Sequence, residues 1–542
     1  MSLNDHLDLH KAYKRVQQDK RDDTLPDVSN YRDYEIVLEE NLEILRSQVA
    51  KPKKYEAKMP FTIDIPKKGF ALRPVASPQI DDRIVYQAIA DFLAPNFTPE
   101  PCVYSNLISS DVNSSRIFKP GVQLWLKFKD DAEKLCHSFA YVVTTDITAY
   151  FEHISHDLLI HRIQDLFSSK VDPETLDELK TLLPRLLRRW NKSKRFGLPQ
   201  VNDASSFFGN LFLDELDKSM LRQGYVFLRY VDDVRIFTND EPSARLALAD
   251  LIIQLREMGL YIASGKTSIK PTAEMLAEIQ DNSRKINAIE EELNSKQPSR
   301  VEVAVHLLEE FINELISTPD KFDDRQFRYC VNRFKRLKVN GLALDAHDNV
   351  ANEVLARLTT MPYATDTFID YLSLFPESEN VQTRVIEFLE SPYNIYAWQE
   401  MMLLELLIRL DILPENKDRA LSVARTIAKT PNKHHICREK AFVFWGKNGD
   451  YQDRREIRGR YHDEPREDVR RSIMFAIQEM QDGERKHFLE SIMRDSRNIG
   501  ITAQYLLAKD FPQYHYYDPP KGFDIAEDWS SNDIDDLPMH SP

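Results

Sequence analysis

The chain has 542 residues, a hydrophobic content of 42 % and a formal net charge of −15, and this length predicts two or three domains with sizeable cores. It contains no run of about 18 apolar residues, so we expect no transmembrane helix. The N-terminal sequence MSLNDHLDLHK lacks a signal peptide's apolar stretch, and four scattered cysteines indicate no disulfide framework. These features predict a cytoplasmic protein without a membrane partner, and the acidic charge disfavours binding of long nucleic-acid duplexes.

Two local groups of basic residues depart from this acidic composition. The first group contains Lys51, Lys53, Lys54 and Lys58, and the second contains Arg185, Arg188, Arg189, Lys192, Lys194 and Arg195, with Trp190 among them. A basic groove with an aromatic side chain can follow a single nucleic-acid strand. A solvated face of an amphipathic helix is the alternative for the second group.

A buried strand is predicted in the segment YVVTTDITAYFEHI, residues 141–154. The apolar run Tyr141, Val142 and Val143 indicates the strand, Asp146 stands at its end, and a helix is expected to start near Ser155. Asp146 either faces other acidic groups or simply terminates the strand or caps the helix.

A β-hairpin is predicted in the segment FLRYVDDVRIF, residues 227–237, because two β-prone runs flank Asp232 and Asp233. Adjacent carboxylates repel each other, and the pKa of one of them should rise. A divalent cation removes this conflict, and oxygen ligands of this kind suit Mg²⁺. Mg²⁺ ions held by carboxylates serve in-line phosphoryl and nucleotidyl transfer. An acidic surface turn is the alternative, since Asp is common in turns.

Five motifs, in family order across about residues 60 to 270, resemble the reverse transcriptase family. Asp146 to Phe151 is similar to the first palm motif, and Tyr230-Val231-Asp232-Asp233 is similar to the third. The others are a fingers motif, Lys68-Gly69-Phe70-Ala71-Leu72-Arg73-Pro74, the second palm motif, Gly197-Leu198-Pro199-Gln200, and the fourth, Gly259-Leu260-Tyr261-Ile262 with Lys266-Thr267.

This resemblance implies a role for each matched residue. It makes Asp146 and Asp232 metal ligands, with the backbone carbonyl of Ile147 as a further ligand and Asp233 as a supporting carboxylate. The cofactor is then Mg²⁺, with Mn²⁺ as the alternative. Lys266 would protonate or order the pyrophosphate, although a plain surface lysine is the alternative.

The resemblance also implies substrate contacts. Arg73 would grip the incoming triphosphate, as a guanidinium can do with two parallel hydrogen bonds. Phe151, or its neighbour Tyr150, would exclude a ribose 2′-hydroxyl and so select dNTPs. Gln200 and Tyr230 complete the expected substrate-binding set.

The second palm motif departs from the family pattern. Val201 replaces a glycine and removes the freedom that allows close backbone approach, Asp203 adds negative charge, and Ser206 replaces a proline. Tyr104-Ser105-Asn106 stands where an aromatic–arginine pair is common. Catalytic residues are kept while template-handling residues are altered, which resembles the bacterial defence-associated reverse transcriptases of the abortive-infection (Abi) type.

From about residue 295, amphipathic helices are predicted to follow one another with apolar residues at three- and four-residue steps. The predicted segments are 301–317, 324–337, 349–360, 365–374, 381–389, 396–409, 417–429, 438–447, 466–481, 482–494 and 499–509. Helices of this length suggest a HEAT-like α-solenoid, with an unrelated helical bundle as the alternative. His434, His435 and Cys437 are isolated from the other cysteines, so no metal cluster is expected there.

The predicted fold is therefore α+β: a right-hand polymerase palm and fingers at residues 1–290, followed by an all-α HEAT-like repeat domain at residues 291–515. The tail, residues 516–542, carries the acids Asp524, Glu527, Asp528, Asp533, Asp535 and Asp536 and is predicted to be disordered.

The Abi-type resemblance implies DNA synthesis from dNTPs that needs no template and starts on a hydroxyl group of the protein itself. The candidate primers are Tyr13, Tyr514, Tyr516 and Tyr517. The expected partners are dNTPs, a single-stranded DNA product attached to the protein, and further copies of the chain. Copying of an associated non-coding RNA is one alternative, and a catalytically silent RNA-binding scaffold is another.

Overall fold

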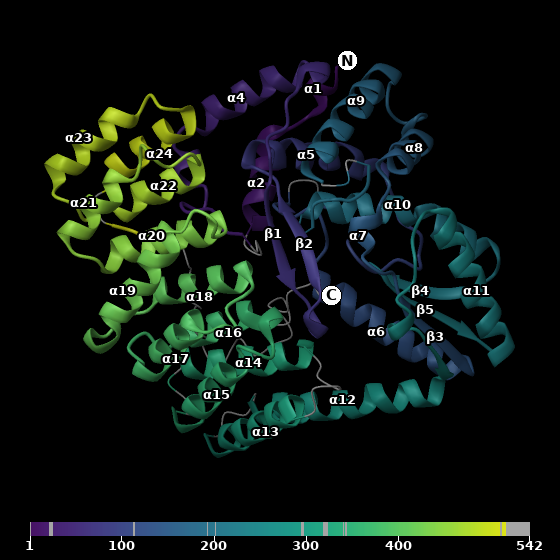
Figure 1. The fold of residues 1–542 in the computed structure, drawn as a ribbon. Helices are drawn as coiled ribbons and strands as arrows, with labels where there is room; N and C mark the ends of the chain where they lie inside the picture. The colour runs from purple at the N-terminus through teal and green to yellow at the C-terminus, as the bar shows by residue number, and fades with distance from the viewer. Residues whose placement is uncertain are drawn as a thin grey trace.

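The computed structural model describes residues 2–20, 25–111, 114–191, 193, 195–200, 202–293, 298–317, 324–339, 341, 344–509 and 512–515. Lys192, Lys194, Val201, Tyr516, Tyr517 and the predicted tail 516–542 lie outside these residues. A mixed α/β half and a curved helical half lie side by side (Figure 1). Across the described ranges, no helix is both long and apolar enough to cross a membrane.

A four-stranded antiparallel sheet forms the palm, and its strand order is β4-β5-β3-β6. The strands are β3 (Tyr141–Asp146), β4 (Val226–Tyr230), β5 (Asp233–Thr238) and β6 (Ser268–Pro271). The strand and the hairpin predicted from the sequence are thereby confirmed.

Both faces of this sheet are covered, because successive side chains on a strand point to opposite faces. Val142, Leu228 and Phe237 pack with residues of α6 (Gly121–Ser138) and α12 (Thr272–Leu293). Val143, Phe227 and Ile236 belong instead to the core that contains α10 (Asp203–Arg222) and α11 (Glu241–Glu257). The palm is thus held rigid from both sides.

The fingers combine a two-stranded hairpin with a group of helices. The hairpin consists of β1 (Phe61–Pro66) and β2 (Leu72–Ser77), joined through η3 (Lys68–Phe70). The helices are α5 (Ile80–Leu93), η4 (Ala94–Asn96), α7 (Tyr150–His153), α8 (His156–Phe167) and α9 (Pro173–Trp190). Helix α8 starts where the sequence predicted, and the Ser155 hydroxyl caps it by accepting from the Leu158 N–H at 3.4 Å.

The N-terminal segment adds α1 (Leu3–His6), α2 (Leu9–Asp19), α3 (Arg32–Glu35), α4 (Leu38–Val49) and η2 (Pro52–Lys54). Buried ion pairs fix α2 against the fingers: Arg15 binds Asp91 at 2.6 Å, and Arg83 binds Asp19 at 2.7 Å.

Two rows of stacked helices form the C-terminal half. One row contains α14 (Asp324–Val339), α16 (Thr365–Leu372), α18 (Ala397–Arg409), α20 (His435–Asn448), α22 (Glu467–Ala476) and α24 (Arg497–Leu507). The other row begins with α13 (Pro298–Ser317), α15 (Leu344–Ala356), α17 (Glu379–Glu390) and α19 (Pro414–Lys429), and α21 (Tyr451–Gly459) and α23 (Asp482–Ile492) lie beyond them. Every predicted helix is present, and α21 was not predicted. The predicted boundary at residue 290 falls inside α12.

The fingers hairpin shares its apolar core with the helical half. Ile63, Ile65 and Val75 are buried in the same cluster as residues of α16 and α18. The carbonyl of Thr62 lies 3.0 Å from His434 Nε2, and the rings of Phe61 and His435 lie 5.9 Å apart. One face of the hairpin is therefore closed by the second half of the chain.

A buried ionic clasp joins the N-terminal segment to the last helices. Arg471 of α22 binds Asp27 at 2.5 Å and Asp33 at 2.7 Å, and the Thr502 hydroxyl donates to Asp33 at 2.6 Å. Burial alone would raise the pKa of Asp27, but Arg471 beside it holds that pKa below its ordinary value. Removing one partner of such a group leaves buried charge without compensation.

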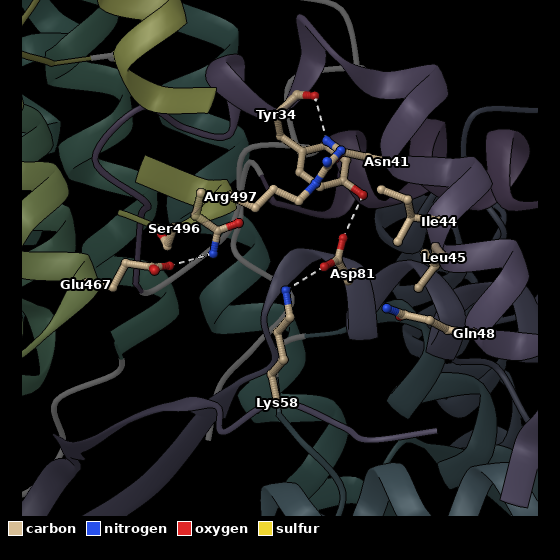
Figure 2. A pocket seen from close by; sticks show the side chains of 11 residues that line it. Tyr34, Asn41, Ile44, Leu45, Gln48, Lys58, Asp81, Glu467, Ser496 and Arg497 are labelled. Carbon is tan, nitrogen blue, oxygen red and sulfur yellow. Dashed lines mark hydrogen bonds and ion pairs between the residues drawn. The ribbon is translucent and has the colours of Figure 1, made fainter. Parts of the chain in front are cut away.

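A cavity of about 210 Å³ lies beside this junction, between α4 and the start of α24. Figure 2 shows Lys58 and Tyr34 meeting at Asp81, at 2.6 Å and 2.7 Å, while Arg497 reaches Asn41 at 2.8 Å. Several of the polar groups that line this cavity are hydrogen-bonded to one another. We therefore describe the cavity as part of the junction between the two halves, not as a ligand site.

Arg471→Ala should lower the free energy of unfolding by about 3–5 kcal/mol, because Asp27 and Asp33 lose their buried partner. Urea unfolding followed by tryptophan fluorescence measures this loss. Arg245→Ala is the control: its pair with Glu241 on α11 is exposed and should cost less than about 1 kcal/mol. Equal losses in the two variants would contradict the role assigned to the clasp.

Candidate active site

The three acids predicted from the sequence meet at one end of the palm sheet. The antiparallel register places Asp146 opposite Asp233 on the neighbouring strands β3 and β5. Tyr230 pairs with Asp233, so Val231 and Asp232 form the turn of the β4–β5 hairpin. Asp146 and Asp233 stand at strand ends and Asp232 lies in the tight turn between two strands, which suits a site that must hold fixed geometry.

The turn of this hairpin is strained, because Val231 has a φ of 57°. A β-branched residue in this left-handed region costs about 1–3 kcal/mol and persists only where its surroundings impose it. Three contacts impose it here. The Val231 N–H donates to Ser105 Oγ at 2.7 Å, its carbonyl accepts from Arg229 at 2.9 Å, and the Asp232 carbonyl accepts from the Ile147 N–H at 3.1 Å.

A buried polar network supports the turn from below. Arg229 and Asp217 are each 1 % exposed and form an ion pair at 2.6 Å. Arg229 also donates to Asn210 at 3.1 Å, and Asn210 donates to the Ser105 carbonyl at 2.8 Å. Arg229, Asp217 and Asn210 were not predicted from the sequence, although an arginine inside the apolar run FLRY is a usable signal for a buried partner.

Burial and mutual repulsion raise the pKa values of the acids. Burial and then Asp146 raise the pKa of Asp232 to about 7, against the opposing effects of its backbone hydrogen bonding and of Lys266. Burial also raises the pKa of Asp146, with Asp233 adding to the rise and Lys266 opposing it. A divalent cation would relieve this repulsion, so the donor set fits one.

The fourth motif brings Lys266 to the acids. The Ala263 N–H donates to the Asp146 carbonyl at 2.7 Å, and the Thr148 N–H donates to the Tyr261 carbonyl at 2.8 Å. These bonds place Ile147 beside Ile262 and η5 (Ser264–Lys266) next to β3. The Lys266 Nζ atom lies 3.6 Å from Asp146 Oδ2, and its side chain is 51 % exposed.

The fingers contribute two cations to the same region. Burial lowers the pKa of Arg73, while Glu152, Asp366 of α16 and Asp232 oppose that fall. Burial and then Arg73 lower the pKa of Lys67, a residue that the sequence analysis missed. The Arg73 Nε atom is buried without a hydrogen-bond partner among the described residues, as expected for a group that awaits an anionic ligand.

The predicted substrate-contacting aromatic residues do not all face the site. Tyr150 is 3 % exposed and its hydroxyl donates to the Gly209 carbonyl at 2.6 Å. Tyr230 is 8 % exposed and packs edge-on against Trp125 at 4.9 Å. Phe151 and Gln200 are half-buried, so Phe151 is the ring that remains available to a nucleotide.

Two of the candidate priming tyrosines are packed inside the protein. Tyr13 is 5 % exposed on α2, and its hydroxyl donates to Glu35 at 3.0 Å. Tyr514 is 9 % exposed in the core of the helical half. Burial holds both rings in place, whereas priming requires a mobile hydroxyl group.

A second group of metal-ligand side chains lies in the helical half. Within the described ranges, His435, Glu439 and Asp468 are the one such trio with ligand atoms within 4.8 Å of one another. Both carboxylates contact the same His435 nitrogen, at 2.9 Å and 3.1 Å, and Asp468 also binds Arg466 at 2.6 Å. These contacts show that the three side chains form an ion-pair network. The network lies next to Phe61, where the fingers hairpin packs against the helical half.

Residues 65–286 match the family model described as reverse transcriptase (RNA-dependent DNA polymerase). The chain contains a reverse transcriptase domain. The match covers the palm sheet and most of the fingers built above. No curated protein matches the chain.

Weak likenesses to solved telomerase structures accompany this reverse transcriptase match. One is apo telomerase from Candida tropicalis truncated from its C-terminal domain, at 14 % identity and a TM-score of 0.28, covering 39 % of this chain and 50 % of that one. A second, apo telomerase from Candida tropicalis, has 12 % identity, a TM-score of 0.29 and coverage of 75 % and 74 %. A third is telomerase from Candida albicans in complex with the TWJ fragment of telomeric RNA, with 11 % identity, a TM-score of 0.29 and coverage of 75 % and 70 %. The chain thus spans half the length of the first of these structures.

Ser105→Ala should lower kcat for dNTP incorporation about ten- to a hundredfold, the scale of small displacements of reacting groups, and leave KM for dNTP nearly unchanged. The reason is that the Val231 N–H loses its acceptor and the turn that carries Asp232 relaxes. Steady-state incorporation assays measure both constants.

Ser105→Thr keeps a hydroxyl and should restore much of the rate. Ser109→Ala is the matched control, since Ser109 lies on the same loop and its hydroxyl accepts from the Asp111 N–H at 3.3 Å. Equal rates for Ser105→Ala and Ser109→Ala would show that the hairpin does not depend on Ser105.

Proposed function

We propose that this chain polymerises dNTPs with Mg²⁺ at Asp146 and Asp232, as a defence enzyme of the abortive-infection type. The catalytic part of the proposal rests on the positions of Asp146, Asp232 and Asp233, which lie together at one end of the palm sheet. The pKa values of Asp146 and Asp232 are raised. A silent scaffold would gain nothing from acids that repel one another, so this alternative is disfavoured.

In the proposed reaction, a hydroxyl group releases its proton to solvent and its oxygen attacks the α-phosphorus of a dNTP. A new P–O ester bond forms, the bond from the α-phosphorus to the bridging oxygen breaks, and pyrophosphate leaves. Asp146, Asp232 and the Ile147 carbonyl would hold the cation, with Asp233 in support, and the bound cation would neutralise charge on the triphosphate. Arg73, assisted by Lys67, binds the triphosphate. Lys266 donates a proton to the leaving pyrophosphate or orders it.

The choice of deoxynucleotides is assigned to Phe151. Its ring and that of Tyr150 lie against Gly209, where an added Cβ would come within 3.3 Å of Phe151 Cε1. The packing against α10 therefore restricts the movement of the Phe151 ring. A fixed ring under the sugar leaves no room for a 2′-hydroxyl.

Phe151→Ala should reduce the preference for dNTPs over NTPs, measured as the ratio of kcat/KM values, by at least about tenfold, because the missing ring no longer excludes the 2′-hydroxyl. Tyr150→Phe is the control: it removes only the hydroxyl bonded to Gly209 and should leave the ratio unchanged. An unaltered ratio in Phe151→Ala would move sugar selection to another residue.

Template-independent synthesis is supported by the altered second palm motif and by the closed fingers hairpin. Asp203 is the first residue of α10, and a carboxylate there is favoured by the helix dipole, so its charge also has a structural explanation. Ile63 and Val75, on one face of the fingers hairpin, are buried in the core of the helical half. The helical half therefore occupies space beside the fingers that a template would otherwise use. Copying of an associated non-coding RNA remains the alternative function.

Protein priming and assembly into a homo-oligomer complete the proposal. The stacked helices α13 to α24 support the HEAT-like interpretation through their two alternating rows. With Tyr13 and Tyr514 packed, priming would need local opening or a hydroxyl elsewhere in the chain.

The test is to incubate nuclease-treated protein with Mg²⁺ and labelled dNTPs without template, and to run denaturing gels with and without protease. Label should migrate with the protein until protease releases it, and it should vanish in the double variant Asp232→Ala/Asp233→Ala, because the cation ligands are gone. Asp130→Ala/Asp131→Ala, an adjacent acid pair on α6, is the matched control and should stay active.

Two results would revise the proposal. Incorporation only after cellular RNA is restored would establish RNA-templated copying. Incorporation that persists in the Asp232→Ala/Asp233→Ala variant would remove these acids from the active site.

A further inference from the structure

The two basic groups seen in the sequence meet on one surface. Helix η2, which carries Lys53 and Lys54, packs against α9, and Arg185 of α9 donates to the Lys53 carbonyl at 2.5 Å. We call this surface the η2–α9 patch and define it by six exposed cations: Lys51, Lys53, Lys54, Arg185, Arg188 and Arg189. Figure 1 shows α9 at the outer edge of the polymerase half.

The charges of the η2–α9 patch are largely uncompensated. Elsewhere most arginines are ion-paired, as in the pairs Arg438–Glu464 at 2.5 Å and Arg425–Asp453 at 2.8 Å. In the patch, Arg188 lies 3.6 Å from Asp157, and both side chains are more than half exposed. The other five cations have no carboxylate partner within 4.0 Å among the described residues.

An uncompensated cluster is unusual in a chain with a net charge of −15. Ion pairs with acidic side chains of the same protein would relieve the repulsion among these cations, and acidic residues outnumber basic ones in this chain. An anionic ligand that spans several cations relieves the repulsion equally well. Glu56 and Asp157 are exposed acids of neighbouring segments, and among the described residues only Asp157 lies within 4.0 Å of a patch cation.

The aromatic residue beside the η2–α9 patch is not the one we expected. Trp190 is 3 % exposed, and its indole N–H donates to Asp82 at 3.4 Å, so it belongs to the core. Phe196, 43 % exposed, lies instead on the loop that follows α9. It adjoins Arg195, whose side chain is 75 % exposed.

This loop leads from the patch to the proposed nucleotide site. The Gly197 N–H donates to the Ile154 carbonyl and the Leu198 N–H donates to the Phe151 carbonyl, both at 2.9 Å. Phe196 therefore stands between the η2–α9 patch and Phe151.

We propose that the η2–α9 patch binds the phosphate backbone of a single-stranded nucleic acid, with Phe196 as a stacking surface for a base. Phosphates match a row of lysines and arginines, and stacking on an exposed ring requires unpaired bases. The acidic charge of the whole molecule disfavours a long duplex. The proposal rests on the proposed function only for what the strand does after it binds.

The test measures fluorescence anisotropy of a labelled strand of about 16 nucleotides, as RNA and as DNA, across a salt series. The variant is Lys51→Gln/Lys53→Gln/Lys54→Gln/Arg189→Gln, which spares Arg185 because of its bond to Lys53. The control is Arg384→Gln/Lys417→Gln/Arg455→Gln/Lys486→Gln, four exposed cations of the helical half that give the same change in net charge.

The patch variant should bind at least tenfold more weakly at about 100 mM salt, and the slope of log affinity against log salt should become shallower by about 0.7 for each phosphate that the variant no longer binds. The control should match the wild type. Phe196→Ala should weaken binding without changing the slope. A stronger effect on RNA than on DNA identifies a template-like strand, and the reverse identifies a DNA product.

Equal affinity and slope in the patch variant and the control would overturn the proposal, and so would patch-dependent preference for a duplex of the same length. Incorporation of dNTPs is assayed in the same wild-type preparation. If binding depends on the patch but no dNTP is incorporated, the strand-binding proposal stands and the polymerase proposal fails. If dNTPs are incorporated but binding does not depend on the patch, the polymerase proposal stands and the strand-binding proposal fails.

Discussion

Three carboxylates crowded at one end of a four-stranded sheet are the constraint around which the polymerase half is built. The antiparallel register fixes Asp146 against Asp233, and a strained turn holds Asp232 beside them. Burial makes their mutual repulsion costly, as the raised pKa of Asp232 shows. The Arg229–Asp217 pair, Ser105 and the cations Lys266, Arg73 and Lys67 are arranged around this core of negative charge, and the arrangement suits a bound cation and a triphosphate.

The helical half is structurally inseparable from the fingers. Phe61, Ile63, Ile65 and Val75 have their core partners among the stacked helices, and the Arg471 clasp ties the N-terminal segment to the far end of the same half. A reverse transcriptase domain cut out at residue 290 would expose this apolar surface. The second half therefore determines the shape of the space beside the fingers hairpin.

Charge is distributed unevenly over the molecule. The helical half neutralises most of its arginines through ion pairs, while the η2–α9 patch leaves its cations open to solvent. A net charge of −15 disfavours non-specific binding of polyanions, and the η2–α9 patch is the local exception that the proposed strand binding uses.

Local sequence determined a good part of this protein. Two β-prone runs on either side of the adjacent acids in FLRYVDDVRIF predicted the hairpin, because strand and turn propensities are local. The spacing of apolar residues likewise predicted the C-terminal helices, apart from α21. The family motifs located Asp146, Lys266 and Arg73, since each motif is a short contiguous segment.

Tertiary structure decided what depends on contacts between distant segments. Tyr150, Tyr230, Tyr13 and Trp190 looked available in sequence, but each is buried by elements far along the chain. Several contacts join residues that are 12 to 444 positions apart in the sequence. They are the hydrogen bonds of Ser105 and Arg229 below the hairpin turn, the Arg471 clasp and the bond between Arg185 and Lys53. No local pattern encodes such pairs, because burial and ion pairing are set by which surfaces meet when the chain folds.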